Sequence, residues 1–205
     1  MNSKIKVVVC GSTFGQLYLK ALQDRSDLFQ IVGLFGTGSE RSKKCAKEYG
    51  ITLYTDIEKI PKETDLACIA VKTAAFGGKG TDIALALLDK GIHVIQEHPS
   101  HPKDMEQCYR IARKKNLVYH IGNLYPYLED VKQFIKCANY LNDNDELLHI
   151  DVMFSGQLSY PLIKILQLAM PSIQKWEMEK QEKNRWKISI TLWQVGRHTN
   201  LYANK

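Results

Sequence analysis

Short apolar runs recur along the first half of the chain, each followed by a polar or glycine-rich segment and then a helical pattern. Continuous apolar runs, as opposed to alternating ones, are typical of parallel strands buried on both faces. The alternation of strands and helices predicts an α/β fold, a Rossmann-type doubly wound parallel sheet with helices on both faces. The predicted strands are residues 4–10, 29–35, 51–54, 65–71, 92–96 and 117–121.

The helix after the first strand is predicted from apolar residues at helical spacing. These residues are Phe14, Leu17, Tyr18, Ala21 and Leu22. The helix after the fifth strand is predicted in the same way, from Met105, Cys108, Tyr109 and Ala112.

Four polar or glycine-rich loops follow strand ends, at residues 11–15, 39–42, 72–80 and 97–101. The carboxyl ends of parallel strands share one edge of the sheet, and ligands bind at that edge. The first loop, Gly11-Ser12-Thr13-Phe14-Gly15, aims backbone N–H groups and a helix N-terminus at a phosphate. Its spacing is one residue tighter than G-x-G-x-x-G, so a plain strand-to-helix turn is an alternative.

The second strand leads into Gly36-Thr37-Gly38-Ser39-Glu40-Arg41-Ser42. An NAD site favours an acid at the strand end, where it accepts a hydrogen bond from the ribose 2′-hydroxyl. Small donors and a guanidinium instead suit a 2′-phosphate, which predicts NADPH with Gly36, Ser39, Arg41 and Ser42 near it. Ser39 is also placed to cap the following helix, and the two roles are compatible.

The third loop begins at Lys72, directly after Val71, and has three glycines among residues 77–80. We also place Val71 and Lys72 at the cofactor. Glycines let backbone approach a ligand closely, although a flexible surface loop has the same composition.

The fifth strand ends in Glu97-His98-Pro99-Ser100-His101-Pro102. Pro102 suits the first position of a helix, so His101 is predicted at its N-cap, where the helix dipole favours a neutral imidazole. His101 is therefore either a proton donor or a cap without chemistry. His98-x-x-His101 lacks further convergent ligands, so no metal site is predicted.

Tyr125 follows the sixth strand and precedes Pro126, which predicts an extended conformation near the same edge. Its phenol is a candidate proton donor, with packing as the commoner role for a tyrosine.

Composition narrows the setting of the 205-residue chain. The net charge of +6 is spread along the sequence, which favours a solvated surface over a nucleic-acid groove. The five cysteines are far apart with no C-x-x-C, and no apolar run is long enough for a membrane span. With no signal peptide visible, these features favour the cytoplasm.

The predicted domains are a dinucleotide-binding domain at 1–122 and a partial α+β domain for substrate and dimerisation at 123–205. In the second domain we expect helices at 127–141 and 160–170 and strands at 149–154 and 187–195. The polar run at 174–187 suggests an interrupted domain, and the strand at 187–195 is expected to be an unpaired edge prone to association. A homodimer is compatible with this.

The pattern over about residues 4–170 resembles the thiazolinyl imine reductases of siderophore biosynthesis, within the glucose–fructose oxidoreductase and inositol dehydrogenase superfamily. His98 stands where the superfamily's Glu-Lys-Pro turn has lysine, and the helix at 160–170 lacks its Asp and His, which argues against a sugar substrate. The motifs are Gly11-x-x-Phe14-Gly15, Gly36-x-Gly38-Ser39-x-Arg41-Ser42, Gly77-Gly78-x-Gly80-Thr81, Gln96-Glu97-His98-Pro99-x-His101-Pro102 and Tyr125-Pro126.

The resemblance implies NADPH-dependent reduction of a thiazoline C=N on a carrier-bound nonribosomal peptide intermediate. It implies His101 and Tyr125 as proton donors, with Glu97 and His98 beside the nicotinamide. It also implies a second domain cut short at its C-terminus. Two alternatives stay open: another NADP-dependent imine or carbonyl reductase, and a non-catalytic NADP-binding protein.

Overall fold

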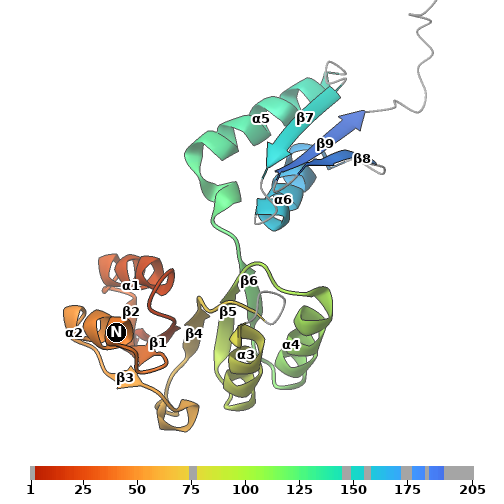
Figure 1. Cartoon of the computed structure of the whole chain (residues 1–205). Coiled ribbons are helices and arrows are strands. Elements are labelled where there is room, and N and C mark those ends of the chain that lie inside the picture. Colours follow the sequence, from red (N-terminus) through yellow and green to blue (C-terminus); the bar gives the residue numbers. More distant parts are fainter. Residues whose placement is uncertain are drawn as a thin grey trace, which may run out of the picture. The chain divides into compact units, whose positions relative to one another are not determined.

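The structure is a computed structural model that describes residues 3–73, 78–144, 149–154, 158–171, 177–182 and 185–191. The chain divides into two compact units, Met1–Gly122 and Asn123–Lys205, and each is described by itself (Figure 1). No helix within the described ranges has the length and apolarity needed to cross a bilayer.

The first unit is built on a six-stranded sheet in which all pairs are parallel. The strand order β3-β2-β1-β4-β5-β6 confirms the predicted doubly wound fold. The order reverses direction between β1 and β4, and this switch point opens a crevice at the carboxyl ends of the strands. The strands are β1 (Ile5–Cys10), β2 (Phe29–Phe35), β3 (Leu53–Tyr54), β4 (Leu66–Ile69), β5 (His93–Glu97) and β6 (Tyr119–Gly122).

Helices cover both faces of this sheet. Leu19 and Leu22 of α1 (Gly15–Asp24) and Cys45 of α2 (Glu40–Glu48) pack with Val7 and Val9 of β1 in one core cluster. Successive residues of a strand point to opposite faces. The buried faces of α3 (Gly80–Asp89) and α4 (Pro102–Lys114) therefore lie against the other side of β4, β5 and β6 (Figure 1).

The buried face of α1 differs from the apolar spacing that predicted the helix. Leu19 is 0% exposed, whereas Leu17 is 53% exposed and Phe14 is 40% exposed. Gly15, Leu19 and Leu22 form the stripe that faces the sheet, because these positions recur at four- and three-residue intervals on one side. Sequence spacing identified the helix but not which of its two apolar stripes is buried.

The second unit places two helices beside an antiparallel sheet of order β7-β9-β8. Its core cluster joins Ala138 of α5 with Leu166, Ala169 and Met170, and Val152 of β7 packs against them. The elements are the 3₁₀ turn η3 (Tyr125–Tyr127), α5 (Glu129–Asp143), β7 (His149–Phe154), α6 (Ser159–Ala169), β8 (Glu177–Glu182) and β9 (Arg185–Thr191).

The strand pairing of this unit corrects two expectations. β8 lies within the polar run, which predicted no strand because Glu-Met-Glu-Lys-Gln-Glu lacks an apolar alternation. β9 is the central strand, paired with both β7 and β8, and so it is not the unpaired edge that was expected. Both differences arise from backbone pairing, of β8 with β9 in the first case and of β9 with β7 and β8 in the second. Residues 192–195 of the predicted strand lie outside the described ranges.

Two leucines of α1 give a matched test of its buried face. Leu19→Ala is expected to lower the free energy of unfolding by about 2–5 kcal/mol, because it leaves a cavity in the core. Leu17→Ala removes the same atoms from an exposed position and should change it by less than about 0.5 kcal/mol. Urea denaturation of both variants measures the difference, and equal losses would contradict the assignment.

Candidate dinucleotide and proton-transfer site

The first loop of the crevice is shaped by a close approach between β1 and β4. Gly11 has a φ of +101°, and a Cβ there would lie 2.7 Å from the Ala70 carbonyl oxygen. Only glycine suits such a position. The helix α1 begins four residues later, and its N-cap residue, Phe14, makes no side-chain capping bond. A helix N-terminus without a side-chain cap, at a switch point, fits the pyrophosphate of a dinucleotide.

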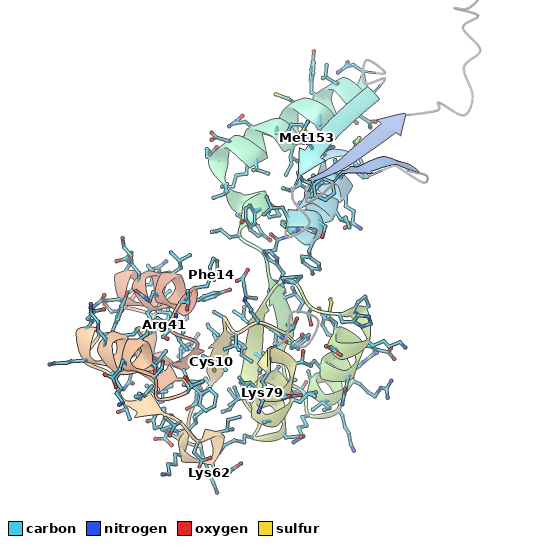
Figure 2. The ribbon with its side chains drawn as sticks, in the orientation of Figure 1. Cys10, Phe14, Arg41, Lys62, Lys79 and Met153 are labelled. Atoms are coloured by element: carbon cyan, nitrogen blue, oxygen red, sulfur yellow. The ribbon has the colours of Figure 1, made fainter. Side chains whose placement is uncertain are left out.

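The first and second loops meet through Arg41. Its Nε donates a hydrogen bond of 3.4 Å to Oγ of Ser12, which is 7% exposed. Figure 2 labels Phe14 and Arg41, which belong to these two loops. The contact places the Arg41 guanidinium beside the first loop, and its binding of a 2′-phosphate stays a prediction.

Ser39 and Ser42 serve the start of α2. Ser39 is its N-cap, with Oγ accepting from the Ser42 backbone N–H at 3.4 Å, as the capping alternative predicted. The Ser42 hydroxyl donates to the Ser39 carbonyl at 2.8 Å and Ser42 is 1% exposed. The Ser42 hydroxyl is therefore used inside the cap, and its placement at the cofactor stays a prediction. Gly36 packs against Ser42, while Thr13 is exposed in the first loop.

The third loop is described in part, since residues 74–77 lie outside the described ranges. A Cβ at Gly78 would collide with the Lys72 carbonyl, and one at Gly80 would collide with the Val71 carbonyl. These two glycines therefore let the chain pack on its own backbone at the end of β4. Val71 also lines Gly11, and Lys72 is exposed.

Glu97 and His98 form a buried pair at the end of β5. The Tyr18 hydroxyl donates to Oε2 of Glu97 at 2.6 Å, and Oε1 lies 3.3 Å from Nε2 of His98. Burial raises the pKa of the Glu97 carboxyl, and the bonds from Tyr18 and from the His98 backbone N–H partly oppose the rise. Burial lowers the pKa of His98, which favours a neutral imidazole at neutral pH.

Other hydrogen bonds hold the turn that contains this pair. The Thr73 hydroxyl donates to the Pro99 carbonyl at 2.9 Å, and the Tyr119 hydroxyl donates to Oε1 of Gln96 at 2.7 Å. The His98–Pro99 peptide bond is cis. Tyr18, Thr73 and Tyr119 were not predicted at the site, because their partners are far away in the sequence and no local pattern marks them.

His101 is the N-cap of α4 and Pro102 is at its first turn, as predicted. Its Nδ1 accepts from the Lys103 backbone N–H at 3.2 Å. In the neutral imidazole, therefore, Nε2 carries the proton. The side chain is exposed, so this N–H is able to donate to a ligand. Among the described residues, no group of three or more His, Cys, Asp or Glu side chains is arranged to hold a metal ion.

Tyr125 belongs to the second unit and begins the 3₁₀ turn η3. This corrects the expected extended conformation. Its backbone N–H donates to Oδ1 of Asn123 at 3.3 Å. Such a local bond stabilises a turn against the preference imposed by Pro126.

The strand order, the crevice and the helix N-terminus together define a dinucleotide-binding protein. Residues 5–123 match the GFO/IDH/MocA model, described as an oxidoreductase family with an NAD-binding Rossmann fold, and the chain belongs to this family. The family consists of NAD(P)-dependent oxidoreductases.

Solved structures share the fold at low sequence identity. GenD2 from gentamicin A biosynthesis, in complex with NAD, is 12% identical with a TM-score of 0.72, and the match covers 90% of this chain and 60% of that one. Biliverdin reductase from Synechocystis sp. PCC 6803, in complex with biliverdin and NADP⁺, is 18% identical with a TM-score of 0.64, over 85% and 60%. KijD10, a 3-ketoreductase from Actinomadura kijaniata, is 17% identical with a TM-score of 0.57, over 69% and 43%.

This chain thus spans 60% or less of the length of these solved structures. The search of curated proteins found no match.

Glu97 makes the stability of the first unit depend on pH in a defined direction. Its pKa is higher in the folded than in the unfolded chain, so the folded chain binds the proton more tightly and stability falls as pH rises. Glu97→Gln keeps an acceptor for Tyr18 without the buried charge. We expect the variant to be more stable than the parent at neutral pH, with the difference shrinking as pH falls toward 4.5.

Urea denaturation across this pH range measures the effect. Glu106→Gln, at an exposed carboxylate of α4, is the control and should show no comparable trend. A Glu97→Gln variant that is less stable than the parent at neutral pH would contradict the assignment.

Proposed function

We propose that this chain binds NADPH and reduces a thiazoline C=N to a thiazolidine on an intermediate tethered to a carrier domain of a nonribosomal peptide synthetase. The observation that carries the proposal is the pairing of two features at strand ends of one sheet. Arg41 lies against the phosphate loop, and His101 offers a protonated Nε2 at the start of α4. The Arg41 guanidinium suits a 2′-phosphate, and the His101 N–H suits an imine nitrogen.

NADPH is favoured over NADH by charge at the end of β2. Arg41 is exposed next to Ser12 and Ser39, and the segment 36–39 supplies no acid for a ribose 2′-hydroxyl. A guanidinium forms forked, charge-assisted bonds with phosphate oxygens. The glycine loop and the uncapped start of α1 would hold the pyrophosphate.

The chemistry needs a hydride for the imine carbon and a proton for its nitrogen. Bound NADPH supplies the hydride. His101 Nε2–H and the Tyr125 phenol are the proposed proton donors, and protonation or hydrogen bonding of the nitrogen makes the carbon a better hydride acceptor. Alcohol oxidation is disfavoured, because His98 replaces the superfamily's lysine and α6 (Ser-Tyr-Pro-Leu-Ile-Lys-Ile-Leu-Gln-Leu-Ala) contains no Asp or His.

A substrate panel separates the alternatives. NADPH oxidation only with thiazolines supports the proposal. Oxidation with other imines or carbonyls would instead identify a different reductase of the family. NADPH binding without turnover on any of them would identify a non-catalytic NADP-binding protein.

Removal of the Arg41 guanidinium should separate the two cofactors. Arg41→Ala is expected to raise the Kd for NADPH by about tenfold or more, since a bond to a charged group contributes about 1.5–3 kcal/mol. The Kd for NADH should stay within about twofold, because NADH lacks the 2′-phosphate. Fluorescence titration of both cofactors measures this, with Arg110→Ala on α4 as the control. Equal weakening for NADPH and NADH would refute the 2′-phosphate assignment.

The proton donors are tested by variants that keep local structure. His101→Asn retains a good N-cap while removing the imidazole, and Tyr125→Phe removes only a hydroxyl. We expect the variant of the true donor to lower kcat by about 10²–10⁴-fold with little change in NADPH affinity. Tyr127→Phe, in the same 3₁₀ turn, is the matched control. Full activity in both variants would remove these two residues from the mechanism.

A further inference from the structure

We infer that Tyr18 is a positioning residue that holds the Glu97 carboxylate facing His98, and so couples the phosphate loop to the turn beside the nicotinamide. The inference rests on the proposed function for its role in turnover. It is argued from the Tyr18–Glu97 hydrogen bond, and both residues belong to the first unit.

The contact joins residues that are 79 positions apart in the sequence. The Tyr18 hydroxyl, from α1, reaches Oε2 of Glu97 at 2.6 Å at the carboxyl end of β5. With that oxygen bonded to Tyr18, the second carboxylate oxygen is turned to Nε2 of His98, at 3.3 Å. The Glu97 side chain is 14% exposed and that of His98 is 9% exposed, so solvent has little access to replace either partner.

The neighbouring strand leaves room for this bond. Gly122 of β6 is the cross-strand partner of Glu97. A Cβ at this position would lie 2.7 Å from the Tyr18 hydroxyl oxygen and 3.3 Å from Oε2 of Glu97. Any side chain there would displace the tyrosine hydroxyl from the carboxylate, so Gly122 and Tyr18 act together.

The same tyrosine contacts the phosphate loop. The rings of Phe14 and Tyr18 are 6.4 Å apart between centroids and meet edge to face. This is a favoured arrangement for two aromatic rings. Phe14 is the residue before the first turn of α1, where the pyrophosphate would bind. A packed path of three side chains therefore leads from the loop, through Tyr18, to Glu97.

Of the four ionisable side chains at this contact, Tyr18, Cys68, Glu97 and His98, it is the Glu97 carboxyl whose titration the Tyr18 bond affects. Burial raises the pKa of Tyr18, which keeps the phenol protonated, and burial raises the pKa of the facing Cys68 thiol to about 12. Burial lowers the pKa of His98, which keeps it neutral at neutral pH. The Tyr18 bond favours the ionised carboxylate, so its loss should raise the pKa of Glu97 further.

The test is a ¹³C NMR titration of the Glu97 carboxyl in the whole chain, which needs neither cofactor nor substrate. In Tyr18→Phe we expect the titration midpoint to move to higher pH than in the parent. Gly122→Ala should move it in the same direction, because it displaces the hydroxyl without altering Tyr18 or Glu97. Tyr109→Phe, which removes a hydroxyl from an exposed tyrosine of α4, should leave it unchanged.

If the chain reduces a thiazoline, the pH dependence of kcat/KM provides a second measurement. The acid limb of kcat/KM in Tyr18→Phe should move to higher pH. The Kd for NADPH should stay within about twofold of the parent, because phenylalanine keeps the ring that packs on Phe14. In a Glu97→Gln background, Tyr18→Phe should cause no further movement of the pH profile, since the group it acts through is gone.

An unchanged Glu97 midpoint in both Tyr18→Phe and Gly122→Ala would overturn the inference, even in an active enzyme. If one variant does not fold, the midpoint in the other decides. A shifted midpoint in a chain that reduces no thiazoline would uphold the contact and refute the proposed function, so the two failures are distinguishable.

Discussion

The candidate site depends on the close parallel pairing of β1 with β4. The backbone of Gly11 lies against the Ala70 carbonyl, and the chain goes from β1 to β2 on one side of this pair and from β4 to β5 on the other. This divergence opens the crevice and aims the start of α1 into it. The Arg41 and Glu97 loops reach the crevice only because their strands run parallel to these two.

The turn after β5 shows how function and stability compete in this unit. Burial beside His98 opposes ionisation of the Glu97 carboxyl. Hydrogen bonds from Tyr18 and from the His98 backbone N–H offset part of this cost. Tyr18, Thr73 and Tyr119 come from separate elements, yet each bonds to the segment 96–99. The turn is therefore held by side chains from α1, from the segment after β4 and from β6.

The second unit has a core cluster and a sheet of its own. Among its described residues, the cluster is centred on Ala138, Leu166, Ala169 and Met170, and the sheet has the order β7-β9-β8. The central strand β9 pairs with the backbones of both β7 and β8. Backbone hydrogen bonds do not depend on side-chain polarity, so the polar strand β8 is able to pair with β9. The proposed donor Tyr125 lies in this unit, whereas His101 belongs to the first.

The sequence alone predicts the six strands of the first unit, their parallel sheet, the four loops at one edge and the N-cap position of His101. These follow from local signals: apolar runs, glycines after strands, and proline at the start of a helix. The tertiary structure is needed to learn that Leu19 and not Leu17 is buried, and that Tyr18 bonds Glu97. Each depends on a surface or partner supplied by another part of the chain, and sequence spacing carries no record of which partner that is.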